Sequence, residues 1–224
     1  TFVLANVDAF EEWLKLPLGE YDIAHLAYTI EREDLKMAGG KQDQYAATFG
    51  GVNYMEFYAN NKVIVNPLRI KSEYLHELEH NLVLFYTQTS RLSSKIIQEQ
   101  TDNVHSNKTS SIDAMHHLKE QSILMKEAIL KGEMDNIGKI LHNGWMHKKQ
   151  MADGISNASI DSIYETALQH GATGGKISGA GGGGFMIFYA PYIHKYALIK
   201  KLSELGGTVM HYTLIDEGLT TWVV

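Results

Sequence analysis

The sequence contains one strongly anomalous stretch, Gly174-Gly-Lys-Ile-Ser-Gly-Ala-Gly-Gly-Gly-Gly-Phe185. Its glycines stand directly before an apolar run, Phe185–Ala190, that predicts a β-strand. Rossmann and Walker loops place their glycines after a strand and at the start of a helix, so the order here excludes both. Glycine lets a backbone approach another loop, or a phosphate, closely. A tight helix-to-strand connection explains the glycines equally well, but Lys176 and Ser178 among them favour an anionic ligand.

The sequence on both sides of this stretch predicts strands separated by helices. A buried strand is expected at Leu82–Thr87, and the spacing of apolar residues predicts helices before and after the glycines. The helices are expected at about 92–104, 112–131, 134–151, 159–169 and 192–205, and a last strand at 208–215. Strands and helices in this order indicate an α+β sandwich.

The N-terminal part is predicted to be mainly helical and to end in a hairpin. Val52–Tyr58 and Lys62–Pro67, joined by a polar turn, predict two antiparallel strands. Before them, helices are expected at about 2–16, 20–37 and 41–49. We therefore expect an N-terminal domain, residues 1–72, and a C-terminal domain, residues 73–224.

Composition and charge narrow the class of protein. The 224 residues carry a formal charge of −6 without a basic run, which argues against nucleic acid as the main partner. The absence of Cys excludes disulfides, thiolate catalysis and Cys-based metal sites. With no apolar run of membrane-spanning length and no signal peptide, a cytoplasmic protein without a membrane partner is expected. The start, Thr1-Phe-Val-Leu-Ala5, reads as the middle of a helix and predicts a truncated N-terminus.

A second informative segment is Gly39-Gly-Lys-Gln-Asp-Gln-Tyr45. Asp43 lies close to Lys41, whose positive charge would keep the carboxylate ionised. Such an Asp could accept or orient the proton of a substrate hydroxyl, although a helix cap beside a solvated Lys explains the same pattern. Glu31 precedes Asp43 by twelve residues and could face the same cleft, where a carboxylate is a suitable ligand for Mg²⁺.

Together the two segments resemble the GHMP family of small-molecule kinases, which includes galactokinase, homoserine kinase and mevalonate kinase. The resemblance rests on Gly40-Lys-Gln-Asp-Gln-Tyr-Ala-Ala47, followed by Gly50-Gly51, and on Lys176–Phe185 far downstream. Through Thr87–Arg91 and Ile155–Asn157 the chain is most similar to the branch whose acceptor is D-glycero-D-manno-heptose 7-phosphate. The resemblance covers essentially the whole chain.

The resemblance implies a fold, a reaction and a set of site residues. It implies the two-domain GHMP α+β sandwich, ATP and Mg²⁺ as cofactors, and phosphorylation of a sugar phosphate, the heptose 7-phosphate, at its anomeric hydroxyl. Asp43 would be catalytic with Lys41 beside it, and Glu31 would bind Mg²⁺. The resemblance implies that the acceptor is bound by Ser90, Arg91 and Lys176. It implies that the nucleotide is bound by Ser178, Gly179, Ala180, Gly181, Gly182 and Gly183.

The sequence departs from the family pattern at its start. The Pro-x-x-Gly-Leu-Gly-Ser-Ser-Ser type of loop that cradles ATP phosphates is absent, and so is the motif before it. We therefore expect this chain alone to be inactive or very weak, and an exposed sheet edge to favour dimerisation or aggregation. Two alternatives stay open: a kinase for a free sugar such as galactose or fucose, and a non-catalytic fragment that binds a metabolite or a partner subunit.

Overall fold

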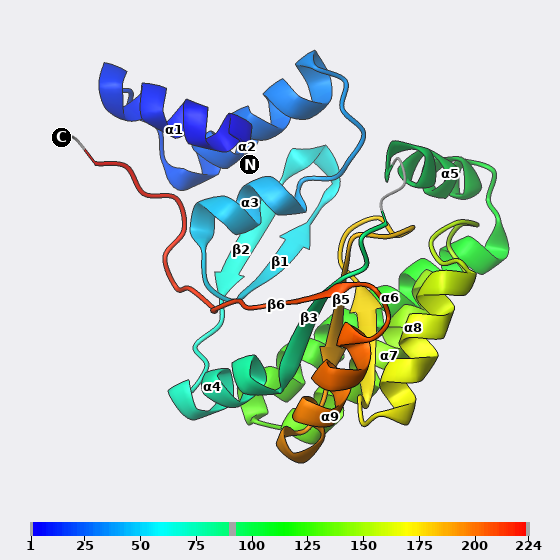
Figure 1. Ribbon diagram of the computed structural model, residues 1–224. Helices are drawn as coiled ribbons and strands as arrows, with labels where there is room; N and C mark the ends of the chain where they lie inside the picture. Colours follow the sequence, from blue (N-terminus) through cyan, green and yellow to red (C-terminus); the bar gives the residue numbers. More distant parts are fainter. Residues whose placement is uncertain (1, 90–92, 223–224) are drawn as a thin grey trace. The chain divides into compact units, whose positions relative to one another are not determined.

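The computed structural model describes residues 2–89 and 93–222, which form two compact units (Figure 1). The first unit comprises residues 1–69 and 214–224, and the second unit comprises residues 70–213. The expected division assigned residues 73–224 to one domain. In the structure the C-terminal segment packs within the first unit, where Leu219 N–H donates to the Thr48 carbonyl and Gly51 N–H to the Ile215 carbonyl, each at 3.1 Å.

The first unit combines helices with a two-stranded antiparallel sheet. Its elements are α1 (Phe2–Leu14), α2 (Glu20–Tyr28), α3 (Gln42–Phe49), β1 (Asn53–Phe57) and β2 (Val63–Pro67). The predicted hairpin is confirmed, with Met55 opposite Val65. One apolar cluster joins α1 to α2, and a second joins α2, α3 and β2 through Ala24, Tyr45 and Val65. Burial of these faces fixes α3 on the hairpin.

A π-helix, Thr29–Asp34, continues directly from α2 where the apolar spacing predicts an α-helix to Met37. The Leu35 N–H donates to the Ile30 carbonyl at 2.9 Å, which is the wider spacing of a π turn. The extra residue per turn shifts side chains relative to α-helical positions. Glu31 is the buried residue of this segment. Such segments are rare and recur at functional sites.

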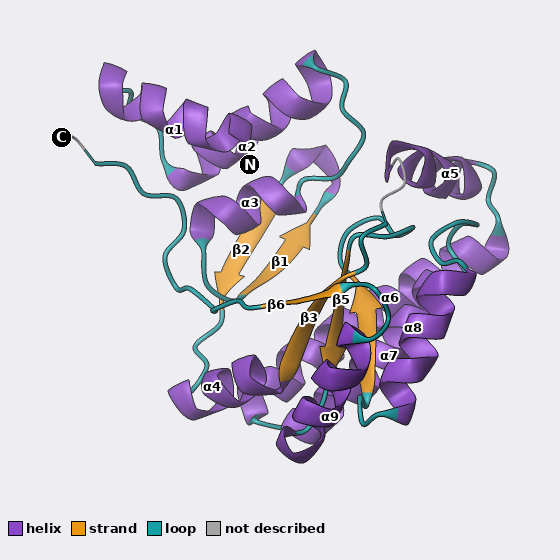
Figure 2. Ribbon diagram, in the orientation of Figure 1, coloured by secondary structure: helices purple, strands orange, loops and turns teal. Residues whose placement is uncertain are grey.

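The second unit is built on a four-stranded antiparallel sheet in the order β4-β5-β3-β6. Its strands are β3 (Leu82–Tyr86), β4 (Gly174–Ile177), β5 (Phe185–Tyr189) and β6 (Thr208–Met210). In the register, Lys176 lies opposite Ile187, and Phe85 lies opposite Met186. Figure 2 shows the helices of this unit gathered around the sheet.

The helices of the second unit pack with this sheet in two apolar clusters. They are α4 (Ser72–Asn81), α5 (Ser93–His105), α6 (Thr109–Lys131), α7 (Met134–Lys148), α8 (Ala158–Gln169) and α9 (Tyr192–Ser203). Phe85 and Phe188 on the sheet pack with Tyr164 of α8 and Leu198 of α9 in one buried cluster. Trp145 of α7 joins the cluster and is completely buried. The α+β fold expected from the sequence is confirmed.

Three features of the second unit differ from the expectation. Helix α4 was not predicted, because its sequence is rich in charge and has few apolar residues. The glycine stretch is not one connection, since its first four residues form β4. The last strand ends at Met210 rather than at residue 215, because the chain then leaves the sheet. Within the described ranges, no helix combines the length and apolar character needed to span a bilayer.

Candidate active site

Asp43 lies in the first turn of α3 with its side chain exposed. A carboxylate there is stabilised by the positive end of the helix dipole. Lys41 directly precedes the helix, but its ammonium donates to the Asn61 side chain at 2.5 Å and lies 4.7 Å from the centre of the Tyr28 ring. No ion pair joins Lys41 to Asp43 among the residues that the structure describes, so the expected partnership of the two charges is not observed.

Glu31 is buried and is connected to the Asp43 helix through the next residue. Its carboxylate accepts a hydrogen bond from the Gln44 side chain, and Arg32 lies 3.4 Å from the same oxygen. Arg32 also donates to the Gly40 carbonyl at 3.2 Å, so the π-helix and the loop before α3 are fixed together. Sequence reasoning placed Glu31 near Asp43 but gave no sign of Gln44 as its partner.

The Glu31 side chain could bind Mg²⁺ through one carboxylate oxygen. One of its oxygens is occupied by Gln44 and Arg32, and the other accepts no hydrogen bond from a described residue. Across the described residues, no group of three or more His, Asp or Glu side chains could hold a metal ion. Mg²⁺ commonly uses one or two carboxylates and keeps phosphate oxygens and water as its remaining ligands. The oxygen of Glu31 without a hydrogen bond fits the role of such a carboxylate ligand. The positive charge of Arg32, next to the other oxygen, would repel the metal ion.

The loop between β4 and β5 is anchored at its glycine-rich end. Gly182 N–H donates to the Ile155 carbonyl at 2.8 Å, and Gly184 N–H donates to the Thr89 carbonyl at 2.7 Å. At Gly183, where φ is +146°, a β-carbon would lie 2.3 Å from the Thr89 carbonyl oxygen. The glycine there allows a backbone-to-backbone contact that any other residue would block.

The other end of this loop carries positive charge. Lys176 projects from β4 on the face opposite the buried Ile177, because neighbouring strand residues alternate. Lys148, the last residue of α7, donates a hydrogen bond from its ammonium to the Gly179 carbonyl. The loop therefore joins predicted nucleotide-binding residues to two lysines, of which sequence reasoning found only Lys176.

Ser90 and Arg91 fall outside the described residues. The residue before them, Thr89, forms part of the contact with the glycine-rich loop, and Thr87 donates to the Gly184 carbonyl from both its N–H and its hydroxyl at 2.9 Å. The residues directly before the predicted acceptor-binding pair thus contact the loop that is predicted to bind nucleotide.

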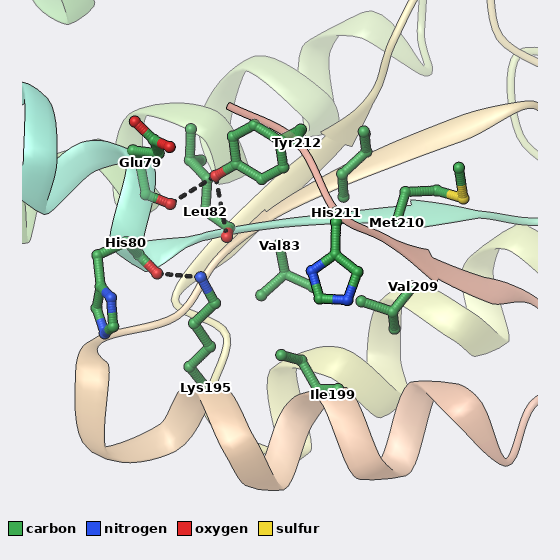
Figure 3. Close-up of a pocket in the computed structure, with 11 residues that line it drawn as sticks. Glu79, His80, Leu82, Val83, Lys195, Ile199, Val209, Met210, His211 and Tyr212 are labelled. Atoms are coloured by element: carbon green, nitrogen blue, oxygen red, sulfur yellow. Dashed lines mark hydrogen bonds between the residues drawn. The ribbon is translucent and has the colours of Figure 1, made fainter. Parts of the chain in front are cut away.

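A separate cavity of about 560 Å³ lies between β3, β6 and α9 (Figure 3). None of the predicted site residues lines it. Lys195 donates to the His80 carbonyl at its rim, and the hydroxyl of Tyr212 donates to the carbonyls of Glu79 and Leu82, at 2.6 and 3.2 Å. Burial, together with the charge of Glu79, raises the pKa of Tyr212 to about 12. These polar side chains already bond to the backbone, which indicates that they stabilise the fold.

Replacing Tyr212 with Phe is expected to lower the free energy of unfolding by about 1–2 kcal/mol, because two backbone carbonyls lose their donor. Urea denaturation measures the change. Tyr196→Phe is the matched control, since Tyr196 lies on α9 and is 80% exposed. Equal effects of the two substitutions would contradict the structural role assigned to the Tyr212 hydroxyl.

Two family models match the chain and define its class. The model of the GHMP kinases N terminal domain matches residues 1–51, and the model of the GHMP kinases C terminal region matches residues 125–208. Together they cover more than half of the sequence and include both Asp43 and the glycine-rich loop. The chain belongs to the GHMP kinase family.

Individual members of the family show which kinases this chain is similar to. The D-glycero-alpha-D-manno-heptose 7-phosphate kinase of Campylobacter jejuni is 47% identical over 222 residues, which are 99% of this chain and 65% of the relative. A crystal structure of a D-glycero-D-manno-heptose 1-phosphate kinase from Bacteroides thetaiotaomicron is 40% identical, with a TM-score of 0.73, over 96% of this chain and 60% of that one. The structure of L. major mevalonate kinase with R-mevalonate, 20% identical with a TM-score of 0.73, covers 97% of this chain and 65% of that one, and shares the fold. The chain thus spans less than two thirds of the length of each.

Proposed function

We propose that this chain carries most of a kinase that transfers the γ-phosphoryl group of ATP to a sugar phosphate, D-glycero-D-manno-heptose 7-phosphate, at its anomeric hydroxyl. The observation that carries the proposal is the 47% identity to the Campylobacter jejuni heptose 7-phosphate kinase, which extends over 99% of the chain. Phosphoryl transfer depends on positioning and charge stabilisation rather than on covalent chemistry by the protein. The described residues offer groups for both tasks.

Asp43 is proposed to accept or orient the proton of the attacking hydroxyl. Its exposure at the start of α3 leaves the carboxylate accessible to a substrate. Lys41, held against Tyr28, is proposed to contribute positive charge near the transferred group rather than to neutralise Asp43. The contact of Glu31 with Gln44 connects a second carboxylate to the same helix.

ATP would supply the phosphoryl group, and Mg²⁺ would neutralise charge on its phosphates. Glu31 is proposed to hold the metal through its free oxygen. Ser178, Gly179, Ala180, Gly181, Gly182 and Gly183 are proposed to lie against the nucleotide, and Ser90, Arg91 and Lys176 to bind the acceptor. A guanidinium and an ammonium both suit a phosphate dianion.

Assays of ADP release, made on two forms of the protein, test this proposal. One is the chain as given, and the other is the chain joined to the part of the Campylobacter jejuni relative that it does not match. We expect the joined form to phosphorylate heptose 7-phosphate at least about 100-fold faster than galactose or fucose, since only the phosphorylated acceptor engages the cations. The unjoined chain is expected to be inactive. A preference of the joined form for a free sugar would overturn the acceptor, and a folded joined form that binds ATP without turnover would favour a non-catalytic role.

The joined form also tests the role of Arg91. Its replacement by Ala is expected to raise KM for heptose 7-phosphate by about 10- to 100-fold, with KM for ATP changed less than about two-fold, because a charge-assisted contact to the acceptor is lost. Steady-state kinetics with each substrate varied in turn measures both values. Equal increases in the two KM values would mean that Arg91 does not contact the acceptor phosphate.

The proposed substrates are small molecules of the cytoplasm, and we infer that the protein acts there. With a formal charge of −6, the chain offers no electrostatic reason to bind nucleic acid.

A further inference from the structure

Two lysines near the start of the glycine-rich loop lack an acidic partner. Lys148 and Lys176 are both half-buried, and the Lys148 ammonium donates to the Gly179 carbonyl. In the ranges that the structure describes, neither lysine forms an ion pair. The adjacent Lys149 differs, since it pairs with Asp161 at 3.2 Å and lies 5.8 Å from the centre of the Trp145 ring. The two lysines at the loop therefore differ from their neighbour Lys149, because they are half-buried without an acidic partner among the described residues.

This arrangement is unfavourable in the ligand-free protein. Burial lowers the pKa of Lys176, and burial together with the charge of Lys176 lowers the pKa of Lys148 to about 8. Bringing two cations together out of water has a high free-energy cost unless an anion accompanies them. Such clusters of perturbed groups occur more often at binding sites than elsewhere.

The backbone beside the lysines offers further donors. Among the described residues, the N–H groups of Gly179 and Ala180, neither of which is buried, donate no hydrogen bond. At Gly179, where φ is +82°, no atom lies within 4 Å of the position of a β-carbon, so the loop is open to solvent there. Successive free N–H groups in a glycine-rich turn form concavities that bind anions. Gly182 and Gly184 fix the far end of the loop, which keeps these donors in position.

We propose that Lys148 and Lys176, together with the N–H groups of Gly179 and Ala180, bind one phosphate group. Lys148 is then a substrate-binding residue that the sequence motifs do not reveal. The proposal rests on the proposed function only for the source of that phosphate, which is either the sugar phosphate acceptor or the nucleotide. The chemistry is the same for both, namely a dianion held by two ammonium groups and backbone donors.

The test is a titration of the chain with inorganic phosphate at constant ionic strength, followed by NMR of isotope-labelled lysine side chains. We expect saturable shifts of the Lys148 and Lys176 signals and an upward shift in the pKa of Lys148, because a bound anion stabilises the charged form. This measurement needs no substitution, so it does not depend on a variant that folds. Shifts that fail to saturate at about 50 mM phosphate would overturn the site, since a specific site of this kind should bind more tightly.

Variants then identify the contributing side chains. Lys148→Gln and Lys176→Gln are each expected to weaken phosphate binding by about 10-fold or more. Lys139→Gln, an exposed lysine of the same helix α7, is the matched control and should change binding less than two-fold. If all three weaken binding equally, the effect is one of net charge and the proposal is wrong.

Competition distinguishes the two sources of phosphate. Heptose 7-phosphate and ADP are each added to the phosphate-bound chain. Displacement by the sugar phosphate at the lower concentration assigns the site to the acceptor, and displacement by ADP at the lower concentration assigns it to the nucleotide. Displacement by neither overturns the proposal. Because binding is measured without turnover, an inactive kinase would leave this result unaffected.

Discussion

Replacing Asp43 with Asn is expected to lower kcat of the active, joined form by about 100- to 10,000-fold, which is the usual contribution of a positioned acid or base. The amide has nearly the same shape as the carboxylate, but it carries no charge and cannot accept the proton of the acceptor hydroxyl. Because Asp43 is exposed, the melting temperature should change little. Single-turnover kinetics separates the loss in the chemical step from any loss in binding.

The matched control for this experiment is Asp34→Asn. Asp34 is also exposed and ends the neighbouring π-helix, so it reports the effect of removing one surface carboxylate from the same unit. We expect it to retain activity within about two-fold. Retention of most activity by the Asp43 variant, or an equal loss in both variants, would remove Asp43 from the catalytic role.

The second large effect is expected from Gly174→Ala, which should lower the free energy of unfolding by about 3 kcal/mol or more. A β-carbon at this position would lie 1.8 Å from the Gly138 carbonyl oxygen and 2.9 Å from the His142 backbone nitrogen. Both neighbours belong to the backbone of α7, so no side-chain rotation relieves the clash. Helix α7 and strand β4 must separate, and calorimetry should report a melting temperature lower by roughly 6–12 °C.

Gly144→Ala provides a control of opposite sign. Gly144 also lies in α7, but a β-carbon there would meet only the Leu118 side chain, at an ordinary 3.8 Å. Alanine is preferred to glycine inside a helix by about 0.5–1 kcal/mol, so this variant should be slightly more stable than the parent. A Gly174 variant as stable as the Gly144 variant would contradict the close approach of α7 to β4.

The spacing of apolar and polar residues predicted the helices and strands in which that spacing is regular. The hairpin around residues 59–61 has polar turn residues between two β-rich runs, and the paired strands were found as expected. Helix α4 has no comparable pattern, since its ten residues carry only three apolar side chains of any size. The π-helix was also missed, because a change from four to five residues per hydrogen-bonded turn leaves no signal in composition.

The sequence suggests candidate site residues where residue type and motif point to chemistry. Asp43 and the glycine-rich loop stand out in this way, and Glu31 was proposed from its distance to Asp43 along the chain; their roles stay predictions. The partners of these residues were not predictable, because they come from other elements: Gln44 for Glu31, and Asn61 with Tyr28 for Lys41. Lys148 lies 28 residues before Lys176, and only the pairing of α7 with the loop after β4 brings it to Gly179.

The route of the chain between the two units determines what a truncation would remove. The second unit is one uninterrupted segment, residues 70–213, whereas the first is assembled from both ends of the polypeptide. In connectivity, the second unit is an insertion within the first. A stop codon after Thr213 would leave all four strands of the larger sheet intact, yet it would deprive the Thr48 carbonyl and the Gly51 N–H of their partners. The damage from a lost C-terminus would therefore appear at the opposite end of the sequence, beside the helix that carries Asp43.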